Sequence, residues 1–208
     1  MKIQKNMATL KDRITKWKEN RTVLQKAGDI LFWVLIILFL IPGPRKAILT
    51  TLNRVVLQVK APRVMNEEKQ EILTDLDYNW ILAWGENEPY YFSNLRFKVI
   101  FVKFWATWCP PCVAEMPEIQ SLYRKYGDRV AFVLATNDSP EEVEAYMEKH
   151  QYQMPTLYLT ETPPGPLSFS GFPTTFIISK DGRVVSKTTG AANWDSKATA
   201  KILDELLK

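Results

Sequence analysis

Cys109 and Cys112 are the only two cysteines of this 208-residue chain. An apolar run at 99–104 precedes them and an amphipathic pattern at 113–126 follows, so we expect the pair at a strand-to-helix turn. Residues i and i+3 share one face of a helix, which can bring the two sulfurs within bonding reach. Unpaired amides and the dipole at a helix start favour negative charge. Cys109 is therefore the expected attacking thiolate, with a pKa of about 3.5–7.5 for a thiol so placed, and Cys112 the resolving thiol.

Pro110 and Pro111 separate the two cysteines. Proline suits the first helical turn, because its missing N–H would have been unpaired there anyway. Two prolines nevertheless remove two donors that could have faced the Cys109 sulfur, and the amide of Cys112 is the nearest one left. The hypothesis that follows is a milder stabilisation of the thiolate, and hence a more reducing couple, than a Cys-X-X-Cys motif with free amides would have.

Other functions of the cysteine pair fit the sequence less well. A structural zinc site needs about four Cys or His ligands, and this chain adds the single His150 to its two cysteines. A purely structural disulfide would close a very small loop and remove little entropy from the unfolded chain. We therefore expect no metal and no bound cofactor, only a redox-active disulfide.

The net charge of +4 conceals an asymmetry along the chain. Residues 1–63 carry 13 Lys and Arg against 3 acidic residues, whereas residues 64–208 carry 14 against 20. The C-terminal part is acidic, so we do not expect it to bind nucleic acid.

The N-terminal third has the pattern of a membrane-associated segment. A basic segment at 1–23 precedes twelve uninterrupted apolar residues at 30–41, which Pro42-Gly43-Pro44 ends. Twelve helical residues rise about 18 Å against a hydrocarbon core of about 30 Å, so the span must start earlier. We expect an uncleaved anchor at 24–41 with residues 1–23 in the cytoplasm. A cleaved signal segment and a helix buried in the soluble core are the alternatives.

Apolar residues recur at helical spacing between the anchor and the C-terminal part. The segment 45–60 is expected to form an interfacial amphipathic helix, or alternatively a helix that packs on the globular domain. The charged segment 61–77 has the composition of a linker.

The globular domain is expected at 78–208, with strands and helices in alternation. A mixed α/β sheet flanked by helices follows from this order. We expect strands at 78–84, 95–104, 130–135 and 154–159, helices starting near 113 and 140 and ending the chain at 197–207, and a hairpin at 174–179 and 183–189.

Two motifs resemble one protein family. The first motif is the stretch Phe-Trp-Ala-Thr-Trp-Cys-Pro-Pro-Cys-Val-Ala-Glu-Met-Pro at 104–117, and the second is Phe-Pro-Thr-Thr-Phe at 172–176. Both are similar to motifs of the TlpA/ResA-like, membrane-anchored thiol-disulfide oxidoreductases, which have the thioredoxin fold. The resemblance covers 78–208. It implies that Pro173 is a cis-proline against the disulfide, that the backbone of Phe172 pairs with a substrate strand, and that Glu115 is the family's acid three residues after the second cysteine. Trp108 is the expected wall of the active site.

Lys103 departs from the family pattern. Six residues before the first cysteine, thioredoxins have a buried Asp and many TlpA-like proteins an Asn. A lysine under the disulfide could depress the pKa of Cys112 or pair with Glu115, and a buried unpaired charge would cost several kcal/mol. The alternative is that Lys103 extends outward as a solvated strand residue.

Together these observations predict a thiol-disulfide oxidoreductase on the outer, periplasmic side of the cytoplasmic membrane. It would reduce disulfides of exported proteins, and the resemblance suggests apocytochrome c thiols as one target and a membrane-bound electron donor as a partner. A disulfide-introducing oxidant and a non-catalytic binding protein on the same scaffold are the alternatives. A peroxidase is disfavoured, because Cys109 stands where that group places a Thr or Ser.

Overall fold

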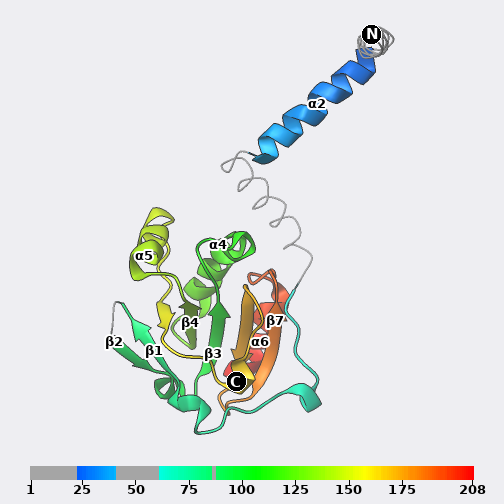
Figure 1. The fold of residues 1–208 in the computed structure, drawn as a ribbon. Helices are drawn as coiled ribbons and strands as arrows, with labels where there is room; N and C mark the ends of the chain where they lie inside the picture. Colours follow the sequence, from blue (N-terminus) through cyan, green and yellow to red (C-terminus); the bar gives the residue numbers. More distant parts are fainter. Residues whose placement is uncertain (1–22, 41–60, 86–87) are drawn as a thin grey trace, which may run out of the picture. The chain divides into compact units, whose positions relative to one another are not determined.

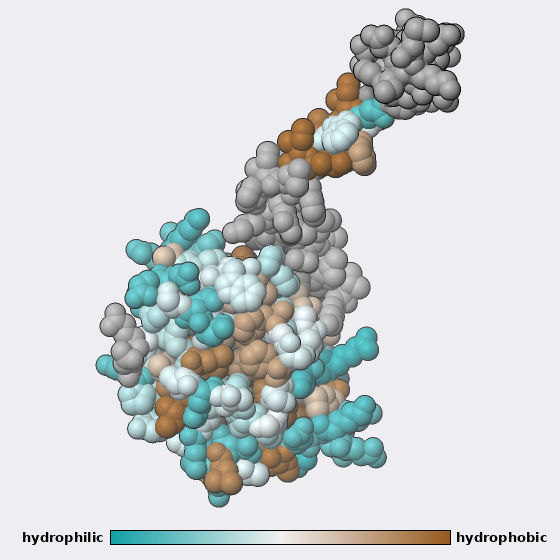
Figure 2. Space-filling model, in the orientation of Figure 1, coloured by the Kyte–Doolittle hydropathy of each residue, from teal (hydrophilic) through white to brown (hydrophobic). Residues whose placement is uncertain are grey.

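The computed structural model describes residues 23–40, 61–85 and 88–208. The chain forms two compact units, 1–48 and 49–208. In the first, Val23–Leu40 forms helix α2. Hydrophobic side chains such as Ile30, Phe32 and Trp33 are about 60% exposed on it, and brown predominates on its visible surface (Figure 2). Within the described ranges, no helix is long and apolar enough to cross a membrane.

The second unit is built on one seven-stranded sheet in the order β2-β1-β5-β4-β3-β6-β7, with β2 and β7 at its two edges (Figure 1). Strands β3, β4 and β5 are parallel, and the remaining pairings are antiparallel. The strands are β1 Ile81–Trp84, β2 Glu88–Tyr91, β3 Val99–Phe104, β4 Val130–Thr136, β5 Thr156–Leu159, β6 Thr174–Ile178 and β7 Val184–Thr189. The mixed α/β sheet that the sequence predicts is therefore confirmed.

The central strand β3 is buried on both faces, which explains its continuous apolar sequence. Successive side chains of a strand point to opposite faces. Val99 and Phe101 accordingly pack in one core cluster, whereas Ile100, Val102 and Phe104 pack in the other. Position 103 shares the face of Val99 and Phe101.

Three helices supply the first of these clusters: α4 Pro110–Tyr126, α5 Pro140–Lys149 and α6 Lys197–Leu207. Helices α4 and α5 connect parallel neighbours, β3 to β4 and β4 to β5, as crossover connections. Ser139 and Ser196 cap α5 and α6, since each hydroxyl accepts a backbone N–H from the first turn. The opposite face is covered by short 3-10 helices, whose buried residues include Tyr78, Phe92 and Leu167.

The structure differs from the sequence expectation at the start of the domain. Tyr78 lies in a 3-10 helix at Asp77–Asn79, and β1 begins only at Ile81. Strand β2 was not predicted, because it contains Pro89 and most of its residues are exposed. An edge strand of this kind has neither the apolar run nor the clean alternation that marks a half-buried strand.

Part of the segment expected as a linker lies along β7. The N–H of Met65 donates to the carbonyl of Val185 at 2.8 Å, and the N–H of Val184 donates to the carbonyl of Glu71 at 2.8 Å. Ile72 forms an isolated antiparallel bridge with Arg183. Residues 65–72 are therefore bound to the outer side of β7. The expectations for 1–22 and 45–60 lie outside the described residues.

Candidate active site

The two cysteines occupy the first turn of α4, immediately after β3, as the sequence predicts. Cys109 is the N-cap residue and Cys112 lies inside the helix. Their sulfurs form a disulfide, with 5.2 Å between the Cα atoms. Cys109 is 4% exposed and Cys112 is fully buried. An approaching partner therefore has better access to the Cys109 sulfur.

The predicted effect of the prolines on hydrogen bonding is present in the structure. Pro110 and Pro111 fill the first two helical positions and contribute no N–H. The N–H of Cys112, the third helical residue, donates to the Cys109 sulfur at 3.3 Å. This donor would remain in place after reduction, where it would stabilise a negative sulfur together with the helix dipole.

The segment before β6 lies at the same end of the sheet as the cysteines. Phe172-Pro173 is a cis peptide, and the next residue, Thr174, pairs with Phe104 at the end of β3. The N–H of Gly190 donates to the Pro173 carbonyl at 2.8 Å and holds this loop. The predicted cis peptide at Phe172-Pro173 is thus confirmed.

Two aromatic rings stand beside this loop. The Trp108 side chain is 64% exposed, which is unusual for so large an apolar group. Its indole meets the partly buried Phe172 ring edge to face, with 5.8 Å between the centroids. The two rings form an apolar surface at the position of the expected active-site wall.

Asp138 holds Trp108 in this orientation and was missed in the sequence. Its carboxylate accepts from the Trp108 indole N–H at 3.0 Å and from the Thr107 backbone N–H at 2.6 Å. The residue is 9% exposed and lies two positions after the end of β4. The position of Asp138 in the sequence could have indicated a role in the site, since ligand-contacting residues of α/β sheets commonly lie just beyond the carboxyl ends of parallel strands.

Lys103 and Glu115 form a buried ion pair beneath α4. The Lys103 ammonium is 2.5 Å from Oε2 of Glu115, and both side chains have zero exposure. The other carboxylate oxygen accepts the N–H of Ala192 at 2.9 Å and also the Trp194 indole N–H. Lys103 therefore pairs with Glu115, as proposed from the sequence, and does not extend into solvent. The ion pair links β3, α4 and the loop after β7.

Further side chains of α4 hold the same loop. Glu118 accepts the backbone N–H of Trp194 at 2.9 Å. Burial raises the pKa of Glu118, although that hydrogen bond opposes the shift. One turn later, Ser121 and Lys125 bind the carboxylate of Asp195. Burial opposes ionisation of Asp195, but the bonds from Lys125 and Ser121 outweigh it and lower its pKa.

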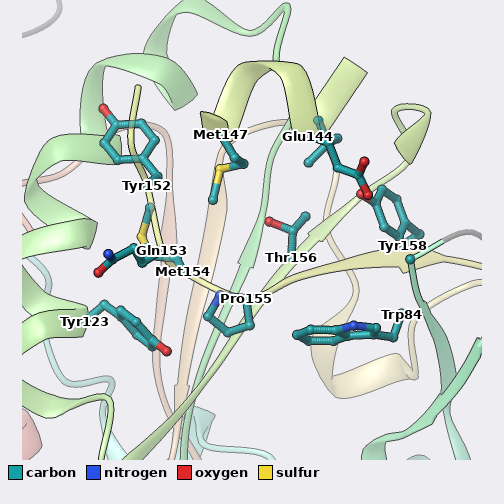
Figure 3. A pocket seen from close by; sticks show the side chains of 12 residues that line it. Trp84, Tyr123, Glu144, Met147, Tyr152, Gln153, Met154, Pro155, Thr156 and Tyr158 are labelled. Carbon is teal, nitrogen blue, oxygen red and sulfur yellow. The ribbon is translucent and has the colours of Figure 1, made fainter. Parts of the chain in front are cut away.

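A pocket of about 380 Å³ lies among α4, α5, β1 and β5, and neither cysteine lines it. Figure 3 shows Trp84, Tyr123 and Tyr158 around it, with the Glu144 carboxylate beside the Tyr158 ring. Burial raises the pKa of the Tyr158 hydroxyl, and the charge of Glu144 adds to the increase. We assign this pocket no part in the thiol chemistry.

Known proteins resemble the chain in sequence and in fold. The Redoxin family model matches residues 81–207. The thiol-disulfide oxidoreductase ResA of Bacillus cereus is 31% identical over 128 residues, which is 60% of this chain and 73% of the relative. A DsbF homologue from Corynebacterium diphtheriae has a TM-score of 0.55 at 18% identity, over 71% of this chain and 94% of its own. A secreted Mycobacterium tuberculosis disulfide oxidoreductase, described as homologous to Escherichia coli DsbE, has a TM-score of 0.53 at 19% identity, over 62% and 99%. At these identities the two structures support the fold alone.

Proposed function

Because the chain belongs to the Redoxin family, as a TlpA/ResA-like thiol-disulfide oxidoreductase of the thioredoxin superfamily, we propose that it reduces disulfide bonds of exported proteins. The observation that carries this proposal is the Cys109–Cys112 disulfide at the start of α4, with the Cys112 N–H donated to the Cys109 sulfur. In the proposal Cys109 attacks the partner, and Cys112 releases it.

The reaction begins with the reduced enzyme. The Cys109 thiolate attacks one sulfur of the partner's disulfide, and the other sulfur leaves as a thiolate that takes up a proton. Cys112 then gives up its proton and attacks the Cys109 sulfur of the mixed disulfide, which releases the partner's second thiol. Two electrons have passed to the partner, and the Cys109–Cys112 disulfide is restored. Both electrons are carried by the two cysteines, so this scheme requires no bound cofactor.

The reducing direction is supported by the two prolines. A thiolate that receives few hydrogen bonds is stabilised less, which favours the disulfide form of the couple and makes the reduced enzyme a better electron donor. Pro110 and Pro111 leave the Cys112 N–H as the donor observed at the Cys109 sulfur. We therefore propose a reductant and not an oxidant.

The surrounding residues have supporting roles in this proposal. The backbone of Phe172 and the adjacent Pro173 bind the extended partner chain, and Trp108 forms a wall beside it. Lys103 and Glu115 act as positioning residues in this proposal, because their buried ion pair joins β3 to α4, the helix that carries Cys112. The carboxylate of Glu115 also fixes the loop after β7.

The proposed location is the outer face of the cytoplasmic membrane. Residues 1–23 would stay in the cytoplasm because of their positive charge, and residues 24–41 would anchor the chain. The segment 45–60 would lie at the interface, and 61–77 would lead to the thioredoxin-like domain at 78–208. An oxidising compartment requires a membrane-bound electron donor to return the enzyme to its dithiol form. Apocytochrome c thiols are one proposed target among exported proteins.

The location can be tested with a tag at the N-terminus and protease added to cells whose outer layers are removed. The proposal predicts that the domain is digested, that the tag is protected, and that alkaline carbonate does not extract the chain. A fully protected domain would contradict it.

The roles of the cysteines can be tested by alkylation and by trapping. In the reduced protein at neutral pH, iodoacetamide should modify Cys109 faster than Cys112 and faster than free cysteine. In cells, Cys112→Ser should accumulate mixed disulfides with exported proteins, whereas the matched variant Cys109→Ser should not. Equal reactivity of the two thiols would overturn the assignment, and the captured partners would identify the pathway.

A further inference from the structure

A row of aromatic rings extends from the core of the sheet to the active-site wall. Phe104 on β3 stacks on Phe169, with 4.1 Å between the centroids. Phe169 in turn stacks on Phe172 at 5.4 Å, and Phe172 contacts Trp108 at 5.8 Å. Each ring supports the next, so the loop between β5 and β6 is packed against the residues beside the disulfide.

A hollow of about 530 Å³, which we call the loop pocket, lies beside the second ring of this row. Phe169 belongs to both the row and the pocket. The loop is shaped by a 3-10 helix at Gly165–Leu167, whose Leu167 is completely buried in the core. The residues that line the loop pocket include Leu159, Thr160, Glu161, Pro163, Ser168 and Phe169.

Several polar groups around the loop pocket already have partners within the protein. The Thr160 hydroxyl donates to the carbonyl of Ile81 at 2.7 Å, and the Ile81 N–H donates to Glu161 at 2.8 Å. The carbonyl of Ser168 accepts the ammonium of Lys187 at 2.9 Å. A ligand therefore meets mainly the apolar surfaces of three residues, Leu159, Pro163 and Phe169, which favours an apolar group over a charged one.

We propose that the loop pocket holds a large apolar side chain of the polypeptide that the enzyme reduces. This inference rests on the proposed function. We assign the pocket to a side chain of the partner polypeptide because the row of aromatic rings connects the pocket to the active site. The ring separations of 5.4 and 5.8 Å lead from Phe169 past Phe172 to Trp108. An extended chain advances about 3.3 Å per residue. The two separations correspond to about three residues of extended chain, and they end at Trp108, which directly precedes Cys109. We therefore place the pocket side chain about three positions from the partner's cysteine.

The consequence is sequence selectivity near the reactive cysteine. Filling a preformed apolar pocket with a matching side chain changes specificity by about tenfold or more. Partner polypeptides with Leu, Met or Phe about three residues from their cysteine should be reduced faster than those with a polar residue there.

The test uses reduced full-length protein in detergent and synthetic peptides that carry one cysteine as a mixed disulfide with thionitrobenzoate. Attack by Cys109 releases thionitrobenzoate, which is followed by its absorbance. Leu replaces Asn at each position from four before to four after the cysteine. We expect an increase of about tenfold in the second-order rate constant at the position near three on one side, and little change at the neighbouring positions.

Two tryptophan variants make the test specific to the pocket. Thr162→Trp narrows the loop pocket, which Thr162 helps to line, and should reduce the Leu-to-Asn rate ratio to near one. Lys201→Trp is the matched control, because the Lys201 side chain on α6 is 77% exposed; this variant should preserve the ratio.

The outcomes separate this inference from the proposed function. A rate that does not depend on the residue near position three, or a ratio unchanged in Thr162→Trp, would overturn the loop-pocket proposal while thionitrobenzoate is still released. Failure of the reduced protein to release thionitrobenzoate from any peptide would instead contradict the assignment of Cys109, and the loop-pocket proposal with it.

Discussion

Replacement of Lys103 by methionine removes the cation from the buried ion pair between β3 and α4. In the wild-type protein the Lys103 ammonium lies 2.5 Å from the Glu115 carboxylate, and neither side chain is exposed. In Lys103→Met the carboxylate keeps two donors, the N–H of Ala192 and the indole N–H of Trp194. It remains hydrogen-bonded, but its charge has no counterion and no access to water.

The expected loss in the free energy of unfolding is about 3–5 kcal/mol, the usual effect of breaking a buried pair from one side. For a domain of this size, 1 kcal/mol corresponds to about 2–4 °C in Tm, so the midpoint should fall by roughly 6–20 °C. The double variant Lys103→Met with Glu115→Gln removes both charges and keeps an acceptor for the two remaining donors. We expect it to recover at least half of the loss, because an uncharged pair of similar volume needs no counterion.

Urea unfolding of the oxidised protein, followed by near-ultraviolet circular dichroism, measures these differences. Lys125→Met is the matched control, since it breaks a lysine–carboxylate pair whose side chains are 56% and 35% exposed. Such a surface pair should contribute less than about 1 kcal/mol. If Lys103→Met cost no more than Lys125→Met, or if the second substitution failed to recover stability, the argument from burial would be refuted.

Four further predictions concern the active-site loop, the reduction potential and the pH dependence of stability. Asp138→Ala should lower stability by about 1–3 kcal/mol, because two donors lose a charged acceptor, and should slow reduction of peptide disulfides; equal rates for the two proteins would show that Asp138 does not position the site. Replacing Pro110 and Pro111 by Gly and His should raise the reduction potential measured against glutathione, and an unchanged potential would contradict the hydrogen-bonding argument. Burial raises the pKa of Glu118 above 4.5, so its contribution to stability is present below pH 4.5 and declines as the pH rises through the folded-state pKa; Glu118→Gln should remove this decline in urea titrations. The pKa of Asp195 is lowered below 3.8, so its contribution is present above that pH and is lost on acidification through the folded-state pKa; Asp195→Asn should flatten the acid limb.

Much of the domain follows from local sequence patterns. The run at Val99–Phe104 is apolar at every position because β3 is buried on both faces, and periodicity detects such a strand without knowledge of its neighbours. The cysteine spacing, the prolines and the Phe172-Pro173 segment are likewise local, and the structure places them at one end of the sheet. Strand β2 escaped detection because its pairing with β1, and not its own composition, makes it a strand.

Long-range contacts explain what the sequence left open in the site. Asp138 is separated from Trp108 by 30 positions. An acidic residue after an apolar run does not indicate in the sequence which residue it will bind. The choice between a paired and a solvated Lys103 depended on the face of β3 that α4 covers. The loop pocket depends on the stacking of Phe169 on Phe104, which are 65 positions apart in the sequence (169 − 104).

The segment at 65–72 affects which parts of the sheet are open to backbone pairing with other polypeptides. An enzyme with the proposed function would meet extended backbones, which can add to an open sheet edge and start aggregation. The start of the outer border of β7 is occupied, since Met65 and Glu71 bond to Val185 and Val184, and Ile72 pairs with the preceding Arg183. At the opposite border, β2 presents Glu88 and Pro89, a charge and a missing donor that both discourage strand addition. If the protein reduces exported polypeptides as proposed, these features would disfavour strand addition at both edges and leave the cis-proline loop as the binding site for a partner chain.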